Sequence, residues 1–243
     1  MIVGPMLEVK GVTKKFGGFT ALSDVNVNLQ KGERLGLIGP NGSGKTTLMN
    51  CIAGTLQLTS GSIVFNQQDV SGTAAYQRAR IGIARSFQIP RPFKSMTVVE
   101  NLLVPLEYLS ARRPSREREM KDEAMSILES MGLKAKADVL PGALTQVELR
   151  RMELARALAA NPQLLICDES MAGLSNSEVD EILELLFALN AQGITIIMIE
   201  HIMSAVMRFS QRLLCLDAGK LVCQGSPSEV VADPHVQRAY LGA

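Results

Sequence analysis

Tryptophan is absent from this 243-residue sequence, and aromatic residues make up only 4% of it. Nothing in the sequence therefore suggests an aromatic binding platform. An excess of positive charge is also missing, because 25 Lys and Arg residues are balanced by 24 Asp and Glu residues. This near-balance gives no electrostatic reason for a nucleic-acid partner, and we expect none.

Long hydrophobic runs are missing as well. The longest apolar stretches, such as ITIIMI at residues 194–199, are far shorter than the roughly 20 residues needed to cross a bilayer. The opening MIVGPMLEVK lacks a basic region followed by a long apolar stretch, so we expect no secretory signal. These absences predict a soluble chain, or one held at a membrane only by a partner.

Cysteine is scarce, and the four cysteines are Cys51, Cys167, Cys215 and Cys223. None of them forms a CxxC motif or a Cys/His spacing typical of a metal site. Cys167 lies in an apolar segment, where we predict a small buried side chain rather than a redox thiol. Cys215 and Cys223 lie on the two arms of a predicted hairpin, and we expect a neighbouring, reduced pair.

What the sequence does contain is an alternation of apolar strands and helices. Short, continuously apolar strands separated by helices are typical of a parallel α/β sheet. Segments that alternate apolar and polar residues indicate half-buried strands instead. The half-buried strands are predicted at 6–16, 21–33 and 60–70, the apolar strands at 34–39, 162–169 and 194–200, helices at 45–53 and 175–193, and a hairpin at 212–225.

The length permits one large domain with an inserted lobe, and 47% hydrophobic residues suffice for a sizeable core. Residues 90–159 differ in sequence pattern from the rest of the chain. REREMKDEAMSILESMGL predicts a charged amphipathic helix that ends at Gly132, and another helix follows LPGALT. We predict one domain over residues 1–243. Residues 1–89 and 160–243 form its core, and residues 90–159 form a helical subdomain.

The strongest chemical signal is the segment GPNGSGKTT. It fits the pattern G-x-x-x-x-G-K-[ST] without a mismatch, after a predicted strand and before a predicted helix. Its glycines allow the backbone N–H groups to point inward around phosphate, and the helix N-terminus adds partial positive charge. We expect Lys45 to reach the β- and γ-phosphates and Thr46 to offer a hydroxyl to Mg²⁺. The predicted nucleotide-binding residues are Gly39, Pro40, Asn41, Gly42, Ser43, Gly44, Lys45, Thr46 and Thr47.

A second signal is LLICDE, an apolar strand that ends in two acids. It delivers Asp168 to the carboxyl end of the sheet, where Mg²⁺ would bind. Glu169 follows directly, and a carboxylate there can orient or deprotonate an attacking water. Together with the phosphate-binding loop, this predicts a chain that binds ATP or GTP and hydrolyses it.

The order of these motifs resembles the nucleotide-binding subunit of an ABC transporter, over essentially the whole chain. The resemblance implies a RecA-like parallel-sheet core, an antiparallel β subdomain and an inserted helical subdomain, with ATP and Mg²⁺ as cofactors. It implies that Phe16 in KKFGGFTAL stacks on adenine, although Phe16 also admits a structural role as a cap on the strand core. It further implies that Gln88 in RSFQIP senses Mg²⁺ and the transmembrane partner. His201 in IMIEHIM matches the histidine that contacts the γ-phosphate, so that Glu169, His201 and Lys45 are the predicted catalytic residues.

The stretch LTQVE has two interpretations, which are compatible. Thr145 and Glu148 form the T-x-x-E pattern of a capping box at a helix start. The same stretch aligns with the family's signature, usually LSGGQ, which faces the γ-phosphate bound by the other subunit, so Thr145 is also a predicted nucleotide contact. Gln146 and Val147 replace its two glycines, and Glu148 adds negative charge unless the capping bond points it away. We interpret LTQVE as a real but degenerate signature.

Two further positions depart from the family pattern. Ser170 stands after the Asp168–Glu169 pair where Pro is usual, and Ser175 in AGLS stands where Asp is common. Both departures bear on communication across the dimer more than on ATP binding.

Four stretches resemble the ATPases of branched-chain amino-acid uptake systems: GIARSFQIPRPFKSMTVVENL, AGLS, RRMELARAL and AYLG. This implies a peripheral protein at the cytoplasmic face of an inner membrane. Its partners would be permease subunits, a second ATPase subunit, identical or different, and indirectly a periplasmic solute-binding protein. The alternative is a soluble ABC ATPase of a non-transport assembly, such as one for iron–sulfur cluster biogenesis. RPFKSMTVVENL, as a coupling surface, argues against that alternative.

Overall fold

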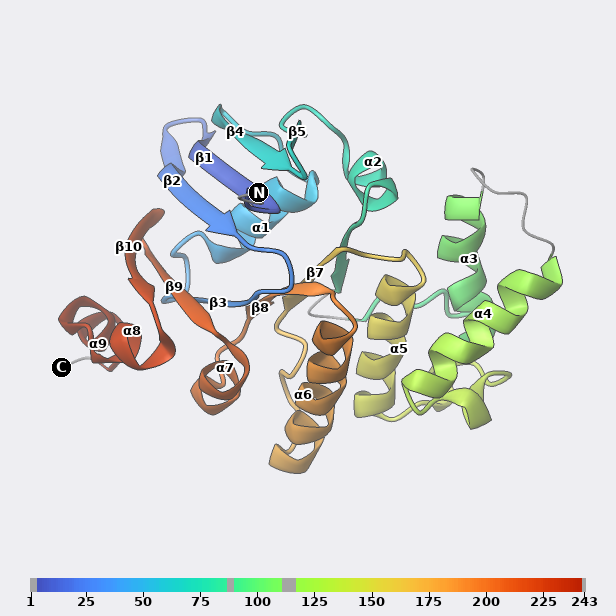
Figure 1. Cartoon of the computed structure of the whole chain (residues 1–243). Helices are drawn as coiled ribbons and strands as arrows, with labels where there is room; N and C mark the ends of the chain where they lie inside the picture. Colours follow the sequence, from blue (N-terminus) through green and yellow to red (C-terminus); the bar gives the residue numbers. More distant parts are fainter. Residues whose placement is uncertain (1–3, 87–89, 111–116, 242–243) are drawn as a thin grey trace.

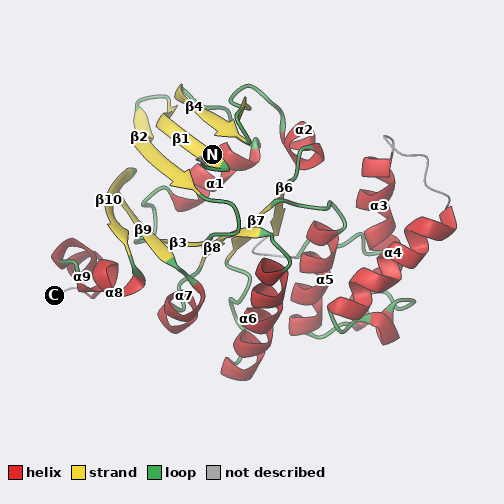
Figure 2. Ribbon diagram, viewed as in Figure 1, coloured by secondary structure: helices red, strands yellow, loops and turns green. Residues whose placement is uncertain are grey.

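A computed structural model of the chain describes residues 4–86, 90–110 and 117–241. The strands form two sheets, and the helices lie around them (Figures 1 and 2). Helices α3, α4 and α5 lie together at one side of the molecule, whereas the C-terminal helices lie at the other (Figure 1). No helix within the described ranges is long and apolar enough to span a bilayer.

The first sheet has four antiparallel strands in the order β2-β1-β4-β5. The strands β1 and β2 form a hairpin in which Phe16 pairs with Phe19 at the turn. Their alternating burial agrees with the half-buried strands that the sequence predicts. The bounds are Leu7–Phe16 for β1, Phe19–Leu29 for β2, Ser60–Phe65 for β4 and Gln68–Asp69 for β5.

The second sheet has six strands in the order β10-β9-β3-β8-β7-β6. All neighbours pair in parallel except β10, which forms an antiparallel hairpin with β9. Every residue of β7 and β8 is buried, as expected for apolar strands covered on both faces. The bounds are β3 Arg34–Ile38, β6 Ile83–Ser86, β7 Leu164–Asp168, β8 Thr195–Ile199, β9 Arg212–Asp217 and β10 Lys220–Gly225.

Helices connect the strands and surround the second sheet. Their bounds are α1 Lys45–Ala53, α2 Ala75–Arg80, α3 Val98–Ser110, α4 Glu117–Ser130, α5 Gln146–Leu158, α6 Asn176–Ala191, α7 Met203–Phe209, α8 Pro227–Ala232 and α9 Pro234–Leu241. Sequence patterning predicts α1, α4, α5 and α6 but not α3. Pro105 lies inside α3, and a proline normally interrupts a helical pattern.

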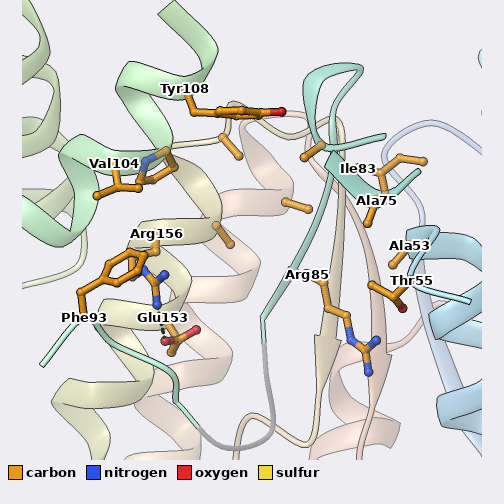
Figure 3. Close-up of a pocket in the computed structure, with 15 residues that line it drawn as sticks. Ala53, Thr55, Ala75, Ile83, Arg85, Phe93, Val104, Tyr108, Glu153 and Arg156 are labelled. Carbon is orange, nitrogen blue, oxygen red and sulfur yellow. Dashed lines mark hydrogen bonds and ion pairs between the residues drawn. The ribbon is translucent and has the colours of Figure 1, made fainter. Parts of the chain in front are cut away.

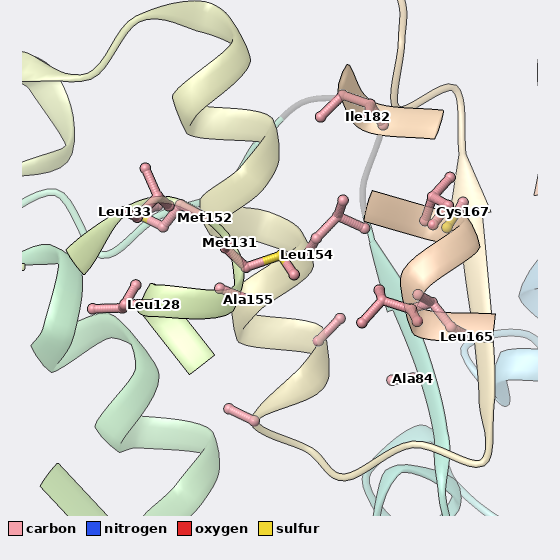
Figure 4. Packing of buried hydrophobic residues seen from close by; sticks show 14 of the residues in the cluster. Ala84, Leu128, Met131, Leu133, Met152, Leu154, Ala155, Leu165, Cys167 and Ile182 are labelled. Atoms are coloured by element: carbon pink, nitrogen blue, oxygen red, sulfur yellow. The ribbon is translucent and has the colours of Figure 1, made fainter. Parts of the chain in front are cut away.

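A groove of about 400 Å³ opens between α2, α3 and α5 (Figure 3). Exposed apolar side chains of α3, Val104 and Tyr108, line one side of it. Beneath this surface, one hydrophobic cluster runs from the helices into the second sheet (Figure 4). It joins Leu128 and Met152 of the helical segment to Leu165 of β7. The helical segment therefore shares a core with the sheet, and the subdomain boundaries at residues 89/90 and 159/160 stay predictions.

The cysteines lie where the sequence indicates. Cys167 is fully buried in β7, and burial raises the pKa of its thiol to about 12, so the predicted small buried side chain is confirmed. Cys215 and Cys223 are register partners across the β9–β10 hairpin, which confirms that they are neighbours. All four thiols are free.

Candidate active site

The predicted phosphate-binding loop joins β3 to α1, as its flanking patterns require. Gly39 has a φ of 149°, and a Cβ added there would lie 2.1 Å from the carbonyl oxygen of Leu216. Only glycine therefore fits this position. Gly44 caps α1 with a left-handed φ of 105° and no side-chain bond to the helix start. The amides of the first turn are thus available to an anion, as at other helix N-termini that bind phosphate.

Lys45, the first residue of α1, is buried beneath the loop. Its Nζ donates hydrogen bonds to the carbonyl oxygens of Gly39, at 2.6 Å, and Pro40, at 3.0 Å. Burial lowers the pKa of the Lys45 ammonium, while the negative charges of Glu169 and Asp168 act to raise it. The loop thus encloses a cation that lies close to both predicted acidic residues.

A cavity of about 300 Å³ lies over the loop and brings together segments from three parts of the chain. Phe16 and Phe19, from the β1–β2 hairpin, form one wall. Phe16 is 48% exposed, so about half of its side chain is accessible from this cavity or from solvent. The remaining lining residues are Ala21, Asn41, Gly42, Ser43, Gly44, Lys45, Thr46, Thr47 and Glu169. Phe19 is a lining residue that sequence reasoning missed, although its place three residues after Phe16 at a hairpin turn was a usable signal.

Glu169 and His201 meet at the carboxyl ends of β7 and β8. The Nε2 of His201 lies 2.9 Å from Oε1 of Glu169. Glu169 has a φ of 47°, which is uncommon for a residue other than glycine, and its amide donates to the carbonyl oxygen of Ile199 at 2.9 Å. Backbone strain is thus held at the residue predicted to be the catalytic base.

Asp168 has an ion-pair partner that the sequence analysis did not predict. Its carboxylate forms an ion pair with the guanidinium of Arg85 on β6, which also donates to the side chain of Asn50 on α1. Parallel pairing of β6 with β7 brings Arg85 and Asp168 together across 83 residues of sequence. No local pattern in the sequence signals a pair of this separation.

The LTQVE turn forms the capping box that the sequence predicts. The amide of Glu148 donates to Oγ1 of Thr145 at 3.3 Å, and the amide of Thr145 donates to Oε2 of Glu148 at 2.8 Å. Lys136 lies 2.8 Å from the Glu148 carboxylate. The hydrogen bond from Lys136 and the amide of Thr145 lower the pKa of Glu148. The capping bond therefore holds the Glu148 carboxylate on the amide of Thr145 at the start of α5, where the ammonium of Lys136 offsets its negative charge.

The Gln146 side chain, which we align with the first signature glycine, contacts the loop after β7. Nε2 of Gln146 lies 3.4 Å from the carbonyl oxygen of Ala172 and packs against Gly173. Thr145 does not line the cavity over the phosphate-binding loop. Gln88, predicted to sense Mg²⁺, lies outside the described residues.

The family model described as "ABC transporter" matches residues 22–172, which span the phosphate-binding loop, the LTQVE turn and the Asp168–Glu169 pair. The chain belongs to the ABC transporter ATP-binding family. The predicted family, fold and ATPase activity are confirmed. A second model, "Branched-chain amino acid ATP-binding cassette transporter", matches residues 220–243.

Individual relatives cover nearly the whole chain. The chain is similar to the high-affinity branched-chain amino acid transport ATP-binding protein LivG of Escherichia coli, with 39% identity over 98% of each chain. It is 36% identical to BraF of Pseudomonas aeruginosa, described in the same words, again over 98% of each. Among solved structures, a nucleotide-free ATP-binding cassette from an ABC transporter superposes with a TM-score of 0.89 at 34% identity, covering 98% of this chain and 100% of that one. An ADP-bound cassette gives the same TM-score and identity, with 98% of this chain and 99% of that one covered.

Proposed function

We propose that this chain is the ATP-hydrolysing subunit of an inner-membrane importer for branched-chain amino acids or related small polar solutes. The observation that carries the proposal is the near full-length similarity to LivG and BraF, whose names specify branched-chain amino acid transport. The separate C-terminal match to a branched-chain cassette supports the same conclusion. The iron–sulfur alternative has no comparable support.

Nucleotide binding is assigned to the cavity over the phosphate-binding loop. Phe16 supplies an exposed aromatic face for the adenine, since an aromatic ring stacks on any base. The residues 39–47 surround the phosphates with backbone amides, and Lys45 exchanges its two carbonyl acceptors for the β- and γ-phosphate oxygens. Thr145 contributes its hydroxyl to the nucleotide held by the partner subunit.

The donor set beside this cavity fits Mg²⁺. Thr46 supplies a hydroxyl and Asp168 a carboxylate, and hard cations prefer oxygen ligands. In nucleotide sites Mg²⁺ is usually held by one or two protein oxygens together with phosphates and water, so a small donor set suffices. Gln88 is assigned as a further ligand on the family pattern. When bound, Mg²⁺ would neutralise part of the negative charge on the phosphates.

The hydrolytic step is assigned to Glu169 and His201. Glu169 lines the cavity, which supports the proposal that its carboxylate accepts a proton from a water that attacks the γ-phosphate. His201 lies within hydrogen-bonding distance of that carboxylate, which supports its assignment to orient Glu169. The contact of His201 with the γ-phosphate is assigned on the family pattern. Lys45 stabilises the charge that develops on the phosphate oxygens.

The partners follow from the degenerate signature. Two ATP molecules are held between head-to-tail subunits, each between one chain's phosphate-binding loop and the other's signature. Side chains at Gln146 and Val147 crowd the approach of backbone to phosphate, so the site completed by LTQVE is the weaker one. We propose a second, different ATPase subunit that carries an intact signature and completes the stronger site.

Replacing Gln146 and Val147 together by glycine is expected to raise ATP hydrolysis by the assembled complex several-fold, because closer backbone approach strengthens phosphate binding in the transition state. The rate is measured by phosphate release at saturating ATP. The matched control is Gln192→Gly with Val222→Gly, a Gln/Val pair outside the LTQVE turn. An unchanged rate in the Gln146/Val147 variant contradicts the assignment of a degenerate signature.

The groove between α2, α3 and α5 is assigned as the permease contact (Figure 3). Val104, Tyr108 and Phe93 expose apolar surface there. Arg156 and Glu153 also line the groove and form an ion pair at 2.8 Å. Arg85, the partner of Asp168, also lines the groove. A helix of the permease docked here would therefore contact a side chain bound to the metal-ligand carboxylate, at the cytoplasmic face of the membrane.

Replacing Val104 by aspartate is expected to abolish co-purification with the permease subunits, because a charge on an apolar docking surface is costly to desolvate. ATP binding by the isolated subunit should stay within about twofold of wild type, because Val104 does not line the nucleotide cavity. The control is Val222→Asp, since Val222 is similarly exposed at 41% but lies on β10. Normal permease association of the Val104 variant would contradict the docking assignment.

The proposed function is tested by transport itself. Proteoliposomes that contain the permease and both ATPase subunits, supplied with the binding protein, should take up labelled leucine only with ATP inside. Unlabelled isoleucine and valine should compete, and glutamate should not. ATP-driven uptake of none of these amino acids would contradict the proposed solute class.

A further inference from the structure

Glu200, which directly precedes His201, is a buried carboxylate with no role in the hydrolysis proposed above. The residue is 2% exposed. Burial raises its pKa to about 7, and the charge of Glu169 acts in the same direction. An acid in such a place is costly unless its oxygens are hydrogen-bonded, so its contacts indicate what it does.

Those contacts join the two segments that carry the catalytic pair. The backbone amide of Met171, two residues after Glu169, donates to Oε1 of Glu200 at 2.8 Å. The backbone amide of His201 also bonds to the Glu200 carboxylate and favours its ionised form. The Glu200 side chain thus binds both the backbone two residues after Glu169 and the backbone of His201.

Two side chains of α5 also bind the loop that follows β7. The carbonyl oxygen of Ala172 accepts from Nη2 of Arg150 at 3.3 Å and from Nε2 of Gln146 at 3.4 Å. The charge of Glu200 acts on Arg150 and opposes the lowering of the Arg150 pKa by burial. Contacts therefore continue from Glu200 through residues 171–172 to the first two turns of the helix that begins at LTQVE.

We propose that Glu200 is a positioning residue. By binding the backbone of both loops, it sets the distance between Glu169 and His201, and it links that pair to α5. This inference rests on the proposed role of Glu169 and His201 in hydrolysis. The charged and titratable groups that face Glu200 are Glu169 and His201 from the two loops, Arg150 from α5 and Cys167 from β7. An ionised Glu200 makes charge-assisted bonds to both amides and holds the loops most firmly.

The test is Glu200→Gln in the assembled transporter in lipid. The amide keeps the shape of the side chain but removes its negative charge, and so weakens the charge-assisted bonds to the two backbone N–H groups. Because small misplacements of reacting groups are costly, kcat should fall about 10-fold while KM for ATP stays within about twofold. The ratio of wild-type to variant kcat should rise as pH increases through about 7, where Glu200 ionises. A merely structural residue would not alter the pH profile.

Control variants distinguish a failure of the Glu200 inference from a failure of the proposed function. Glu33→Gln changes a carboxylate that also accepts a backbone amide, from Gln30 at 2.8 Å, and it should leave kcat unchanged. If Glu169→Gln retains activity, the proposed function fails; if Glu169→Gln is inactive and Glu200→Gln matches wild type, only this inference fails. Should Glu200→Gln not fold, the Met171 amide resonance in the wild-type chain should titrate near pH 7. A Met171 amide that does not respond to pH overturns the proposal.

Discussion

A transporter in which Glu169 is replaced by glutamine should hydrolyse ATP at least about 100-fold more slowly than wild type, because general-base catalysis contributes roughly 10²- to 10⁴-fold. The amide cannot accept the proton of the attacking water, although it keeps the size of the carboxylate and an oxygen within reach of His201. ATP binding should be preserved, so the ATP-bound closed dimer should accumulate. Single-turnover hydrolysis and size-exclusion chromatography with ATP measure the two effects.

The matched control for this experiment is Glu184→Gln, which changes an exposed acid on α6. It should leave both the rate and the dimer population unchanged. Wild-type turnover in the Glu169 variant would refute the catalytic role of that carboxylate. In a heteromeric complex the partner's own base is replaced as well, so that the residual rate of the weaker site, which LTQVE completes, does not add to the measured rate.

Loss of the Lys45 side chain should produce the second large effect. Lys45→Ala removes the cation that the loop encloses and leaves the carbonyl oxygens of Gly39 and Pro40 facing the phosphates. We expect the affinity for ATP to fall at least about 100-fold, since a charge-assisted hydrogen bond in a partly desolvated site contributes about 3 kcal/mol. Titration with a fluorescent ATP analogue measures this affinity.

Lys31→Ala is the control for charge alone, because Lys31 is exposed in the turn before β3. It should bind the analogue as wild type does. Thermal unfolding without nucleotide distinguishes a defect in binding from a defect in folding. A Lys45→Ala chain that folds and binds ATP as tightly as wild type would show that this lysine does not contact the phosphates.

Local patterns in the sequence predict the parts of the site that depend on short spacings. The phosphate-binding loop between β3 and α1 is one such part, and the capping box of Thr145 and Glu148 is another. Both are set by residues within a few positions of one another, where side-chain chemistry and backbone conformation determine the structure directly.

The parts that could not be predicted depend on contacts between distant segments. The Arg85–Asp168 ion pair requires the pairing of β6 with β7, and the Lys136–Glu148 pair requires the fold of the helical segment. The bond between Met171 and Glu200 crosses from one loop to the next. These contacts are fixed by strand order and helix packing, for which a single sequence carries no local signal.

The helix α3 was not predicted for a different reason. Its apolar residues pack into the cluster shared with α4 and α5, and this burial outweighs the cost of Pro105 within the helix. Local propensity favours an interruption at that position, and tertiary packing overrides it. The groove that we assign to the permease depends on this helix.

The most direct test of the account is ATP hydrolysis by the purified chain, first alone and then with its second ATPase subunit and permease subunits in lipid. We expect weak ATP hydrolysis by the chain alone and a strong rise on assembly, because LTQVE completes a poor site and the partner's signature completes the good one. Full activity of the chain alone, unchanged by its partners, would contradict it, since LTQVE would then be a competent signature and the two sites would be equivalent.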